Sequence, residues 1–145
     1  MTKSISAEDR IAINDLLMEY AWANDSADVE LLVSLFTADA VLMLSDGHRY
    51  ENSDGIRRFA TEHGSQPGRA GRQHLVQQVL FKPRAEGCAV RSYWMVIQAL
   101  VATNSKFIRA VGYYDDIVVK AGGRWLLKSR TMGGWNDQTK PPARL

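Results

Sequence analysis

Residues 88–120 read CAVRSYWMVIQALVATNSKFIRAVGYYDDIVVK. Two long runs, 88–103 and 107–120, are rich in β-branched and aromatic residues, and the turn-forming pair Asn104-Ser105 separates them. Because the connection is so short, the two runs are predicted to pair as neighbouring antiparallel strands.

The same pattern continues on both sides of this hairpin. Residues 73–82 and 124–132 are further candidate strands, and the separators Pro83 to Gly87 and Gly122-Gly123 carry turn chemistry. The second half of the chain is therefore predicted to be a four-stranded antiparallel meander.

The first half carries helical periodicity instead. A helix should open at Ser6, with Asp9 completing a variant capping box, and a second short helix should be capped by Asp28. A third helix should be capped by Ser53 or Asp54. The residues expected to face inward are Ile13, Leu16, Leu17, Tyr20, Ala21 and Asn24 on the first helix, Leu31, Leu32, Leu35 and Phe36 on the second, and Ile56, Phe59, Ala60 and His63 on the third.

One short strand, 41–44, and a return strand at Tyr50 are expected between the second and third helices. Helices first and strands later indicate an α+β fold, with residues 1–145 forming one domain that ends in a tail, 133–145. Long twisted strands curl, so helices on one side of such a sheet would enclose a pocket. The glycine-rich loop 64–71 is a candidate lid or a plain connector.

Composition excludes several classes of protein. The chain has 145 residues, 46% hydrophobic and 23% charged, with a formal net charge of only +2, which argues against nucleic-acid binding. The single Cys88 permits no internal disulfide and is expected to be a buried thiol. We see no signal peptide, no membrane-spanning run and no metal-binding motif, so a cytoplasmic protein without metal or cofactor is expected.

Three side chains carry the chemistry. Tyr20 and Asp25 lie at the end of the first helix, and His74 opens the first strand of the meander. An imidazole held by a carboxylate can act as a general base, and a phenol can donate a proton. Five residues along a helix turn it by about 140°, so Tyr20 and Asp25 reach one pocket only if the helix ends before Asp25. Each also has a structural interpretation: a strand histidine, a helix-end carboxylate and a core aromatic.

Candidate substrate contacts are mostly aromatic or soft and apolar, and the alternative for each is the core or a subunit interface: Tyr50, Trp22, Met43, Phe59, Trp94 and Arg130. An arginine facing an enclosed pocket would bind an oxyanion. Arg91 or Arg130 could instead pair with Asp116. Alternation places Arg109 on the face opposite Tyr114, but does not tell which face is inward.

An ordered set of short motifs resembles one known family. The set is Tyr20-x-x-x-x-Asp25, Leu35-Phe36-Thr37-x-Asp39-Ala40-Val41, Gly55-Ile56, His74, Ser92-Tyr93, Gly112-x-Tyr114-x-Asp116 and Trp125. Over roughly residues 7 to 132 the chain resembles the SnoaL-like branch of the NTF2-like superfamily.

This resemblance implies a cone-shaped curved sheet around a deep apolar pocket. Relatives include scytalone dehydratase, hexachlorocyclohexane dehydrochlorinase, bile acid 7α-dehydratase, steroid isomerases and polyketide cyclases, many of them cofactor-free. Asp25 and His74 match the aspartate–histidine pair of the dehydrochlorinase and the bile acid enzyme, and Tyr20 matches a tyrosine of the latter. Of the histidines, His48, His63 and His74, only His74 falls at a family position. A homodimer or homotrimer is also implied.

The leading hypothesis is a cofactor-independent lyase or isomerase that acts on a mid-sized ring compound, whether phenolic, steroid-like or polyketide-like. It would eliminate water, halide or a small carbonyl fragment, or shift a double bond. The alternative is a non-catalytic ligand-binding or assembly module, such as a dioxygenase small subunit. A polyketide cyclase is the third hypothesis, since fold alone does not decide activity.

Overall fold

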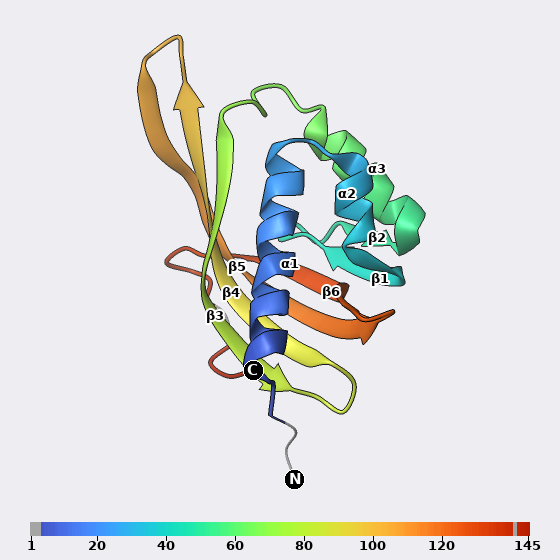
Figure 1. The fold of residues 1–145 in the computed structure, drawn as a ribbon. Coiled ribbons are helices and arrows are strands. Elements are labelled where there is room, and N and C mark those ends of the chain that lie inside the picture. The colour runs from blue at the N-terminus through green and yellow to red at the C-terminus, as the bar shows by residue number, and fades with distance from the viewer. Residues whose placement is uncertain (1–3, 141) are drawn as a thin grey trace.

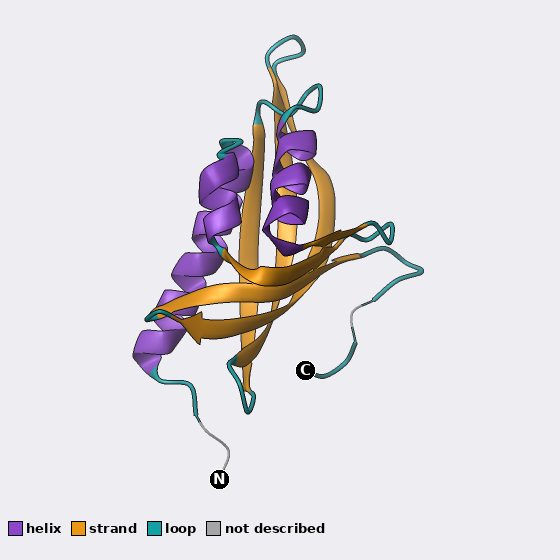
Figure 2. Cartoon of the chain, turned by 90° about the vertical axis from the view of Figure 1, so that its right-hand side faces the viewer, coloured by secondary structure: helices purple, strands orange, loops and turns teal. Residues whose placement is uncertain are grey.

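The computed structural model describes residues 4–140 and 142–145. Its elements, in chain order, are α1 (Ala7–Asp25), α2 (Val29–Ser34), β1 (Phe36–Met43), β2 (Arg49–Glu51), α3 (Asn52–Gly64), β3 (Arg72–Pro83), β4 (Cys88–Leu100), β5 (Ser105–Ala121) and β6 (Arg124–Gly134). The helices gather on one side of a curved sheet, and the β4–β5 hairpin projects beyond them (Figures 1 and 2). The α+β class is confirmed.

The six strands form one sheet in the order β2-β1-β6-β5-β4-β3. The predicted meander is confirmed, because β3 to β6 pair antiparallel with their chain neighbours. The pairing that sequence reasoning did not foresee joins β1 to β6 in parallel. The strand β3 is left at one edge of the sheet, beside α1.

The prediction for the second helix and the first strand was wrong at their junction. The helix was expected to include Leu35 and Phe36, but α2 ends at Ser34 and β1 already begins at Phe36. Phe36 pairs with Leu127, and the Leu127 N–H donates to the Leu35 carbonyl at 2.9 Å. Both side chains are still buried, but they are buried by the pairing of β1 with β6 and not by a further turn of helix.

Two of the three predicted helix caps are confirmed. The Ser6 side chain accepts the Asp9 N–H, and the Asp28 side chain accepts the Leu31 N–H. The third was placed too late, because Asn52 performs the capping and its side chain accepts the N–H groups of Asp54 and Gly55. Its φ of 59° lies in the left-handed region that asparagine tolerates better than most residues.

The core lies between the helices and the concave face of the sheet. Along β5 the buried side chains alternate and include Tyr114, Asp116 and Val118, whereas Arg109 is exposed. The inward face of this strand is therefore the Tyr114 face, which alternation alone could not decide. Cys88 is a buried free thiol, as expected.

The tail runs along the outer face of the sheet. β6 continues to Gly134, and Trp135 then packs against Tyr93 with ring centroids 4.8 Å apart. The Arg91 guanidinium donates to the Pro142 carbonyl at 2.5 Å. Trp135 is thus on the side away from the helices and does not plug the enclosed pocket. Within residues 4–140 and 142–145, no helix has the length and apolar character to cross a membrane.

Candidate functional site

Asp25 and His74 meet where the last turn of α1 lies beside the first residues of β3. The Asp25 Oδ1 is 2.5 Å from the His74 Nδ1, and its Oδ2 accepts the His74 backbone N–H at 2.8 Å. The two side chains are only 19% and 10% exposed. The expected pair is therefore brought together, with the carboxylate bonded to both the ring and the backbone of the histidine.

The position of β3 explains this double contact. His74 pairs with Val96 of β4 on one side, and the other edge of β3 has no neighbouring strand. A backbone N–H on a free edge needs an acceptor when it is partly buried, and Asp25 supplies one. One carboxylate thus satisfies the strand edge and also fixes the imidazole ring.

The second ring nitrogen of His74 is also engaged. His74 Nε2 lies 3.2 Å from Asn24 Nδ2, the residue before Asp25. Asn24 in turn accepts from Arg69 twice, through its side-chain Oδ1 and through its backbone carbonyl at 3.1 Å. Arg69 belongs to the loop 64–71, so this loop is connected to the imidazole through one amide side chain.

An inner cavity of about 270 Å³ lies against this network. Its walls come from both helices and sheet: Asn24, Leu44, Ser45, Asp46, Phe59, His63, Arg69, His74, Trp94, Tyr114 and Met132. A separate outer groove of about 420 Å³ is lined by Asp25 and His74 together with Met18, Trp22 and Leu75. Asn24 lines the inner cavity and Asp25 the outer groove, which places the Nε2 side of the ring at the inner cavity.

The position of Trp94 in the wall of the inner cavity depends on Gly112. A Cβ at Gly112 would come within 2.4 Å of the Trp94 ring, so only glycine lets the indole lie over β5. The indole Nε1–H donates to the Tyr113 carbonyl at 3.0 Å, which leaves its apolar surface for the cavity. Trp94 is thereby fixed as a flat apolar wall beside His74 and Tyr114.

Two further titratable groups line the cavity. His63 Nδ1 lies 3.1 Å from the Phe59 carbonyl and must donate to it, which leaves Nε2 as the acceptor nitrogen. Burial lowers the pKa of His63, so its ring is neutral near pH 7. Burial also raises the pKa of Tyr114, so its hydroxyl keeps its proton and can donate.

Tyr20 is placed elsewhere. The helix continues through Asp25, so the turn of about 140° between the two residues is kept, and Tyr20 points into the core with no exposed surface. It is absent from the linings of the inner cavity and the outer groove. Its ring packs edge-on against Phe36 and Tyr114, with both centroids 6.0 Å away.

Arg130 is likewise a core residue rather than a cavity wall. It is fully buried, donates to both oxygens of Asp116 at 2.8 and 2.7 Å, and contacts the rings of Tyr20 and Tyr114. Pairing with Asp116 was one of the two expectations for this residue. The substrate contact was the other, and the structure gives it no support, because the guanidinium is held by its partner.

The remaining expected substrate contacts are divided among different places. Phe59 and Trp94 line the inner cavity. Tyr50 is buried behind Phe59 and donates to Glu62 at 2.9 Å, and Trp22 is 74% exposed beside the outer groove. Met43 is half-buried at the end of β1 and lines neither space.

Sequence reasoning missed six polar residues of the cavity: Asn24, Ser45, Asp46, His63, Arg69 and Tyr114. Asn24 had been counted with the inward face of its helix, Tyr114 belongs to a motif that had been singled out, and Arg69 lies in the loop 64–71 that was expected to be a lid or a connector. His63 had been counted with the inward face of its helix, and the structure shows that this face reaches the cavity. Within the described parts of the chain, no three His, Cys, Asp or Glu side chains are grouped as a metal site would require.

Comparison with known proteins agrees with this architecture. The model of the SnoaL-like domain matches residues 6–131. The chain belongs to the SnoaL-like family. None of the curated proteins matches the sequence.

Solved structures share the NTF2-like, cystatin-like fold of this SnoaL-like protein. A protein of unknown function from Nostoc punctiforme is 18% identical, with a TM-score of 0.81 over 93% of this chain and 97% of its own. A candidate scytalone dehydratase from Novosphingobium aromaticivorans is 22% identical, with a TM-score of 0.77 over 89% and 85%. The beta subunit of a candidate aromatic-ring-hydroxylating dioxygenase from the same species is 17% identical, with a TM-score of 0.75 over 90% and 92%. At these identities the likeness establishes the fold alone.

Proposed function

We propose that this protein is a cofactor-independent lyase or isomerase that uses His74 as a general base on a ring compound in the inner cavity. The observation that carries the proposal is the Asp25–His74 hydrogen bond of 2.5 Å with the opposite ring nitrogen on the cavity side. Such a pair supplies acid–base catalysis without any bound group.

In the proposed reaction, the substrate first displaces the Asn24 amide from His74 Nε2, and Nε2 then removes a proton from a carbon or a hydroxyl of the substrate. Asp25 holds the proton on Nδ1 and stabilises the imidazolium that forms. The electron pair released from the substrate then forms a double bond, and water, halide or a small carbonyl fragment departs. In an isomerisation, the same imidazolium would return the proton to another carbon.

The cavity volume narrows the substrate class. A closed apolar cavity of about 150 Å³ binds benzene. The cavity of about 270 Å³ is open beside the exposed Ser45 and Asp46, so it would hold a substituted single ring or two fused rings within its walls, whereas a four-ring steroid would extend into solvent. Phe59 and Trp94 offer apolar surface to such a ring. Among the three ring classes expected from the sequence, the phenolic one therefore fits best.

The proton donor for the leaving group or the oxyanion is assigned to Tyr114 in this proposal. Tyr20 was expected in that role, but Tyr114 lines the inner cavity and Tyr20 does not. Burial raises the pKa of both phenols, so each keeps its proton. The two Tyr→Phe variants should therefore have different effects. Tyr114→Phe should lower kcat, and Tyr20→Phe should affect mainly stability.

The test is a screen of one- and two-ring phenols and ketones for elimination, isomerisation and ring closure, followed by His74→Gln and Asp25→Asn. Ligand binding is followed by Trp94 fluorescence, and the fold by circular dichroism. An enzyme of the proposed type should lose turnover in both variants while still binding substrate. A ligand that binds the wild type without any turnover would favour the non-catalytic binding module, and ring closure without loss of a fragment would favour the cyclase.

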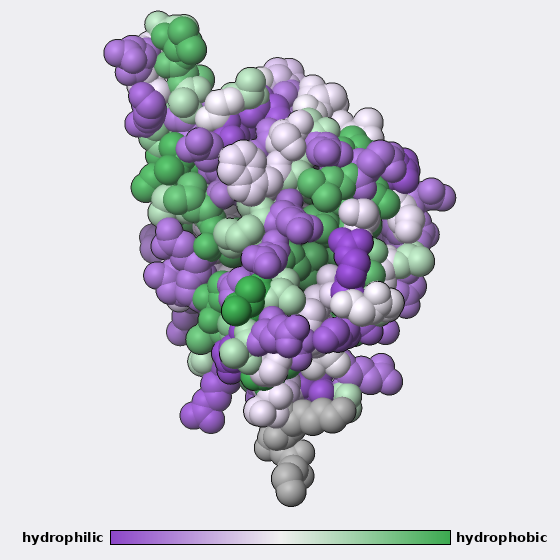
Figure 3. All heavy atoms as spheres, in the orientation of Figure 1, coloured by the Kyte–Doolittle hydropathy of each residue, from purple (hydrophilic) through white to green (hydrophobic). Residues whose placement is uncertain are grey.

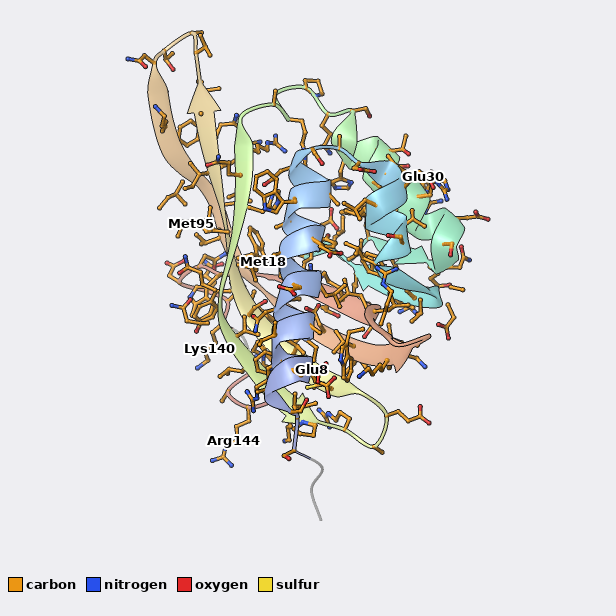
Figure 4. All side chains as sticks on the ribbon, viewed as in Figure 1. Glu8, Met18, Glu30, Met95, Lys140 and Arg144 are labelled. Carbon is orange, nitrogen blue, oxygen red and sulfur yellow. The ribbon has the colours of Figure 1, made fainter. Side chains whose placement is uncertain are left out.

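A homodimer or homotrimer stays a prediction. Its support is the outer face of the sheet, where Tyr93, Val111 and Trp135 are exposed and line a groove of about 380 Å³. Figure 4 places Met95, which lines the same groove, at the margin of the sheet away from the helices, and Figure 3 shows apolar atoms along that margin and on the projecting hairpin. Light scattering coupled to gel filtration would test it, because a monomer at all concentrations contradicts the prediction.

A further inference from the structure

The hydrogen bonds around His74 form a chain. The Arg69 cation at one end determines which groups in this chain donate and which accept. The Arg69 guanidinium can only donate, so the atom of Asn24 that it meets must be the acceptor Oδ1. The other atom of the same amide, the donor Nδ2, is then the one that faces His74 Nε2. A flipped amide would set two donors against each other at the arginine, which costs a buried hydrogen bond.

The other end of the chain requires the same direction. Asp25 accepts at His74 Nδ1, so Nδ1 carries the ring proton. Nε2 then has a free lone pair, which is what the Asn24 amide needs as its acceptor. A fixed cation and a fixed anion thus impose one tautomer, and both impose it with the lone pair on the cavity side.

The structure assigns Asn24 and Arg69 as positioning residues that keep the His74 ring proton on Nδ1 and its Nε2 lone pair directed at the Asn24 amide, at the edge of the inner cavity. Only the catalytic role of these two residues rests on the proposed function. The assignment of the tautomer stands on the hydrogen-bond chain alone. Asn24 is 8% exposed and Arg69 half-buried, so solvent does not offer either an easy substitute partner.

The loop that carries Arg69 is itself fastened to the sheet. The Gly71 carbonyl accepts the Ala99 N–H at 2.9 Å, and the Ala70 carbonyl accepts from the buried Gln98 side chain at 3.0 Å. A Cβ at Gly71 would lie 2.4 Å from the Ala99 carbonyl oxygen. The loop 64–71 is therefore an anchored support for Arg69, which gives the positioning chain a rigid base on β4.

The decisive variant is Asn24→Asp, which changes a donor into an acceptor at almost constant size. The new carboxylate would still accept from Arg69, but it would present an oxygen to Nε2 and so demand a proton there. Asn24→Leu removes both hydrogen bonds without adding an acceptor. Arg69→Met removes the cation that fixes the amide, and Arg72→Met is its matched control, because Arg72 bonds Gln98 rather than Asn24.

The readout is nitrogen NMR of protein labelled on histidine, which distinguishes a protonated ring nitrogen from a bare one. Only three histidines are present, so His74→Gln assigns the signals. The wild type should show His74 with a protonated Nδ1 and a bare Nε2. At the same neutral pH, Asn24→Asp should show both nitrogens protonated, Arg69→Met should move the Nε2 signal, and Arg72→Met and Asn24→Leu should leave Nε2 bare.

Activity gives a second readout once a substrate is known. Arg69→Met should lower kcat by roughly 10- to 100-fold with little change in KM, as losing the partner of a functional histidine does elsewhere.

Two results would overturn the assignment. One is a wild-type spectrum with the His74 proton on Nε2. The other is an Arg69→Met spectrum identical to that of Arg72→Met, and this variant keeps the test open if Asn24→Asp does not fold. Neither depends on turnover, so a protein that proves inactive with every substrate would refute the proposed function and leave the tautomer assignment to be decided by NMR.

Discussion

Replacing Asp116 with asparagine should destabilise the protein far more than a single surface charge change. Asp116 and Arg130 are both fully buried side chains joined by two hydrogen bonds of 2.8 and 2.7 Å. Burial alone would lower the pKa of Arg130, but the Asp116 carboxylate raises it above its ordinary value, so the guanidinium stays charged. The variant would leave that charge buried against two tyrosine rings without a counter-ion.

The expected size follows from the burial of the pair. Removing one partner of a buried ion pair costs about 3–5 kcal/mol, because the remaining charge cannot return to water. For a chain of this length, each kcal/mol lowers the melting temperature by roughly 2–4 °C, so a fall of about 6–20 °C is expected. Asp115, one residue earlier and 30% exposed, pairs with Arg91 on the outer face. Asp115→Asn should cost less, about 1.5–3 kcal/mol, because Arg91, although only 9% exposed, still donates to the backbone carbonyls of Pro142 and Arg144.

Urea denaturation followed by tryptophan fluorescence, with thermal unfolding by circular dichroism, measures both variants. A double variant, Asp116→Leu with Arg130→Met, should recover much of the loss, because removing both charges leaves no buried ion unpaired. If Asp116→Asn costs no more than Asp115→Asn, then the pair is not a desolvated ion pair and the reasoning fails.

Three further predictions concern stability and are read by urea denaturation. Burial lowers the pKa of His63 below its ordinary value of 6.5, so the unfolded chain takes up a proton before the folded protein does as the pH falls. Between about pH 7.5 and 5.5 the wild type should therefore lose more stability than His63→Gln. Equal losses would contradict this prediction. Gly71→Ala should cost about 1–3 kcal/mol, because its φ is +82° and the new methyl would meet the Ala99 carbonyl oxygen; no loss would mean that the loop shifts freely. Leu17 is fully buried, so Leu17→Ala should cost about 2–5 kcal/mol. Ile11 is 64% exposed, so Ile11→Ala should cost less than about 0.5 kcal/mol. Similar costs would refute the assignment of the face of α1 that packs in the core.

The meander was predictable because its signals are local. Alternation along 107–120 and turn residues such as Gly122-Gly123 are visible without knowledge of any partner strand. The parallel pairing of β1 with β6 was not predictable, because it joins residues about ninety positions apart through a register that no local pattern encodes. The early start of β1 has the same origin, since Phe36 is equally apolar on a helix face and in a strand.

The candidate site was predictable in part. Asp25 and His74 were found from residue type and from the resemblance, and their contact is confirmed by the structure. Asn24 and Arg69 were not found, because an amide and a loop arginine signal nothing until their hydrogen-bond partners are placed. Tyr20 was expected at the pocket but lies in the core. Its position in a motif does not tell which face of a continuous helix it occupies.

The burial of Tyr20 still gives it a connection to the site. The Arg130 guanidinium lies 4.1 Å from the centroid of the Tyr20 ring and 3.8 Å from that of Tyr114, so it contacts both rings. Because Asp116 fixes Arg130 by two hydrogen bonds, the four side chains form one rigid unit, and Tyr114 is its member at the inner cavity. If Tyr114 is the proton donor of the proposed function, Tyr20 would support it by packing and would not contact the substrate itself.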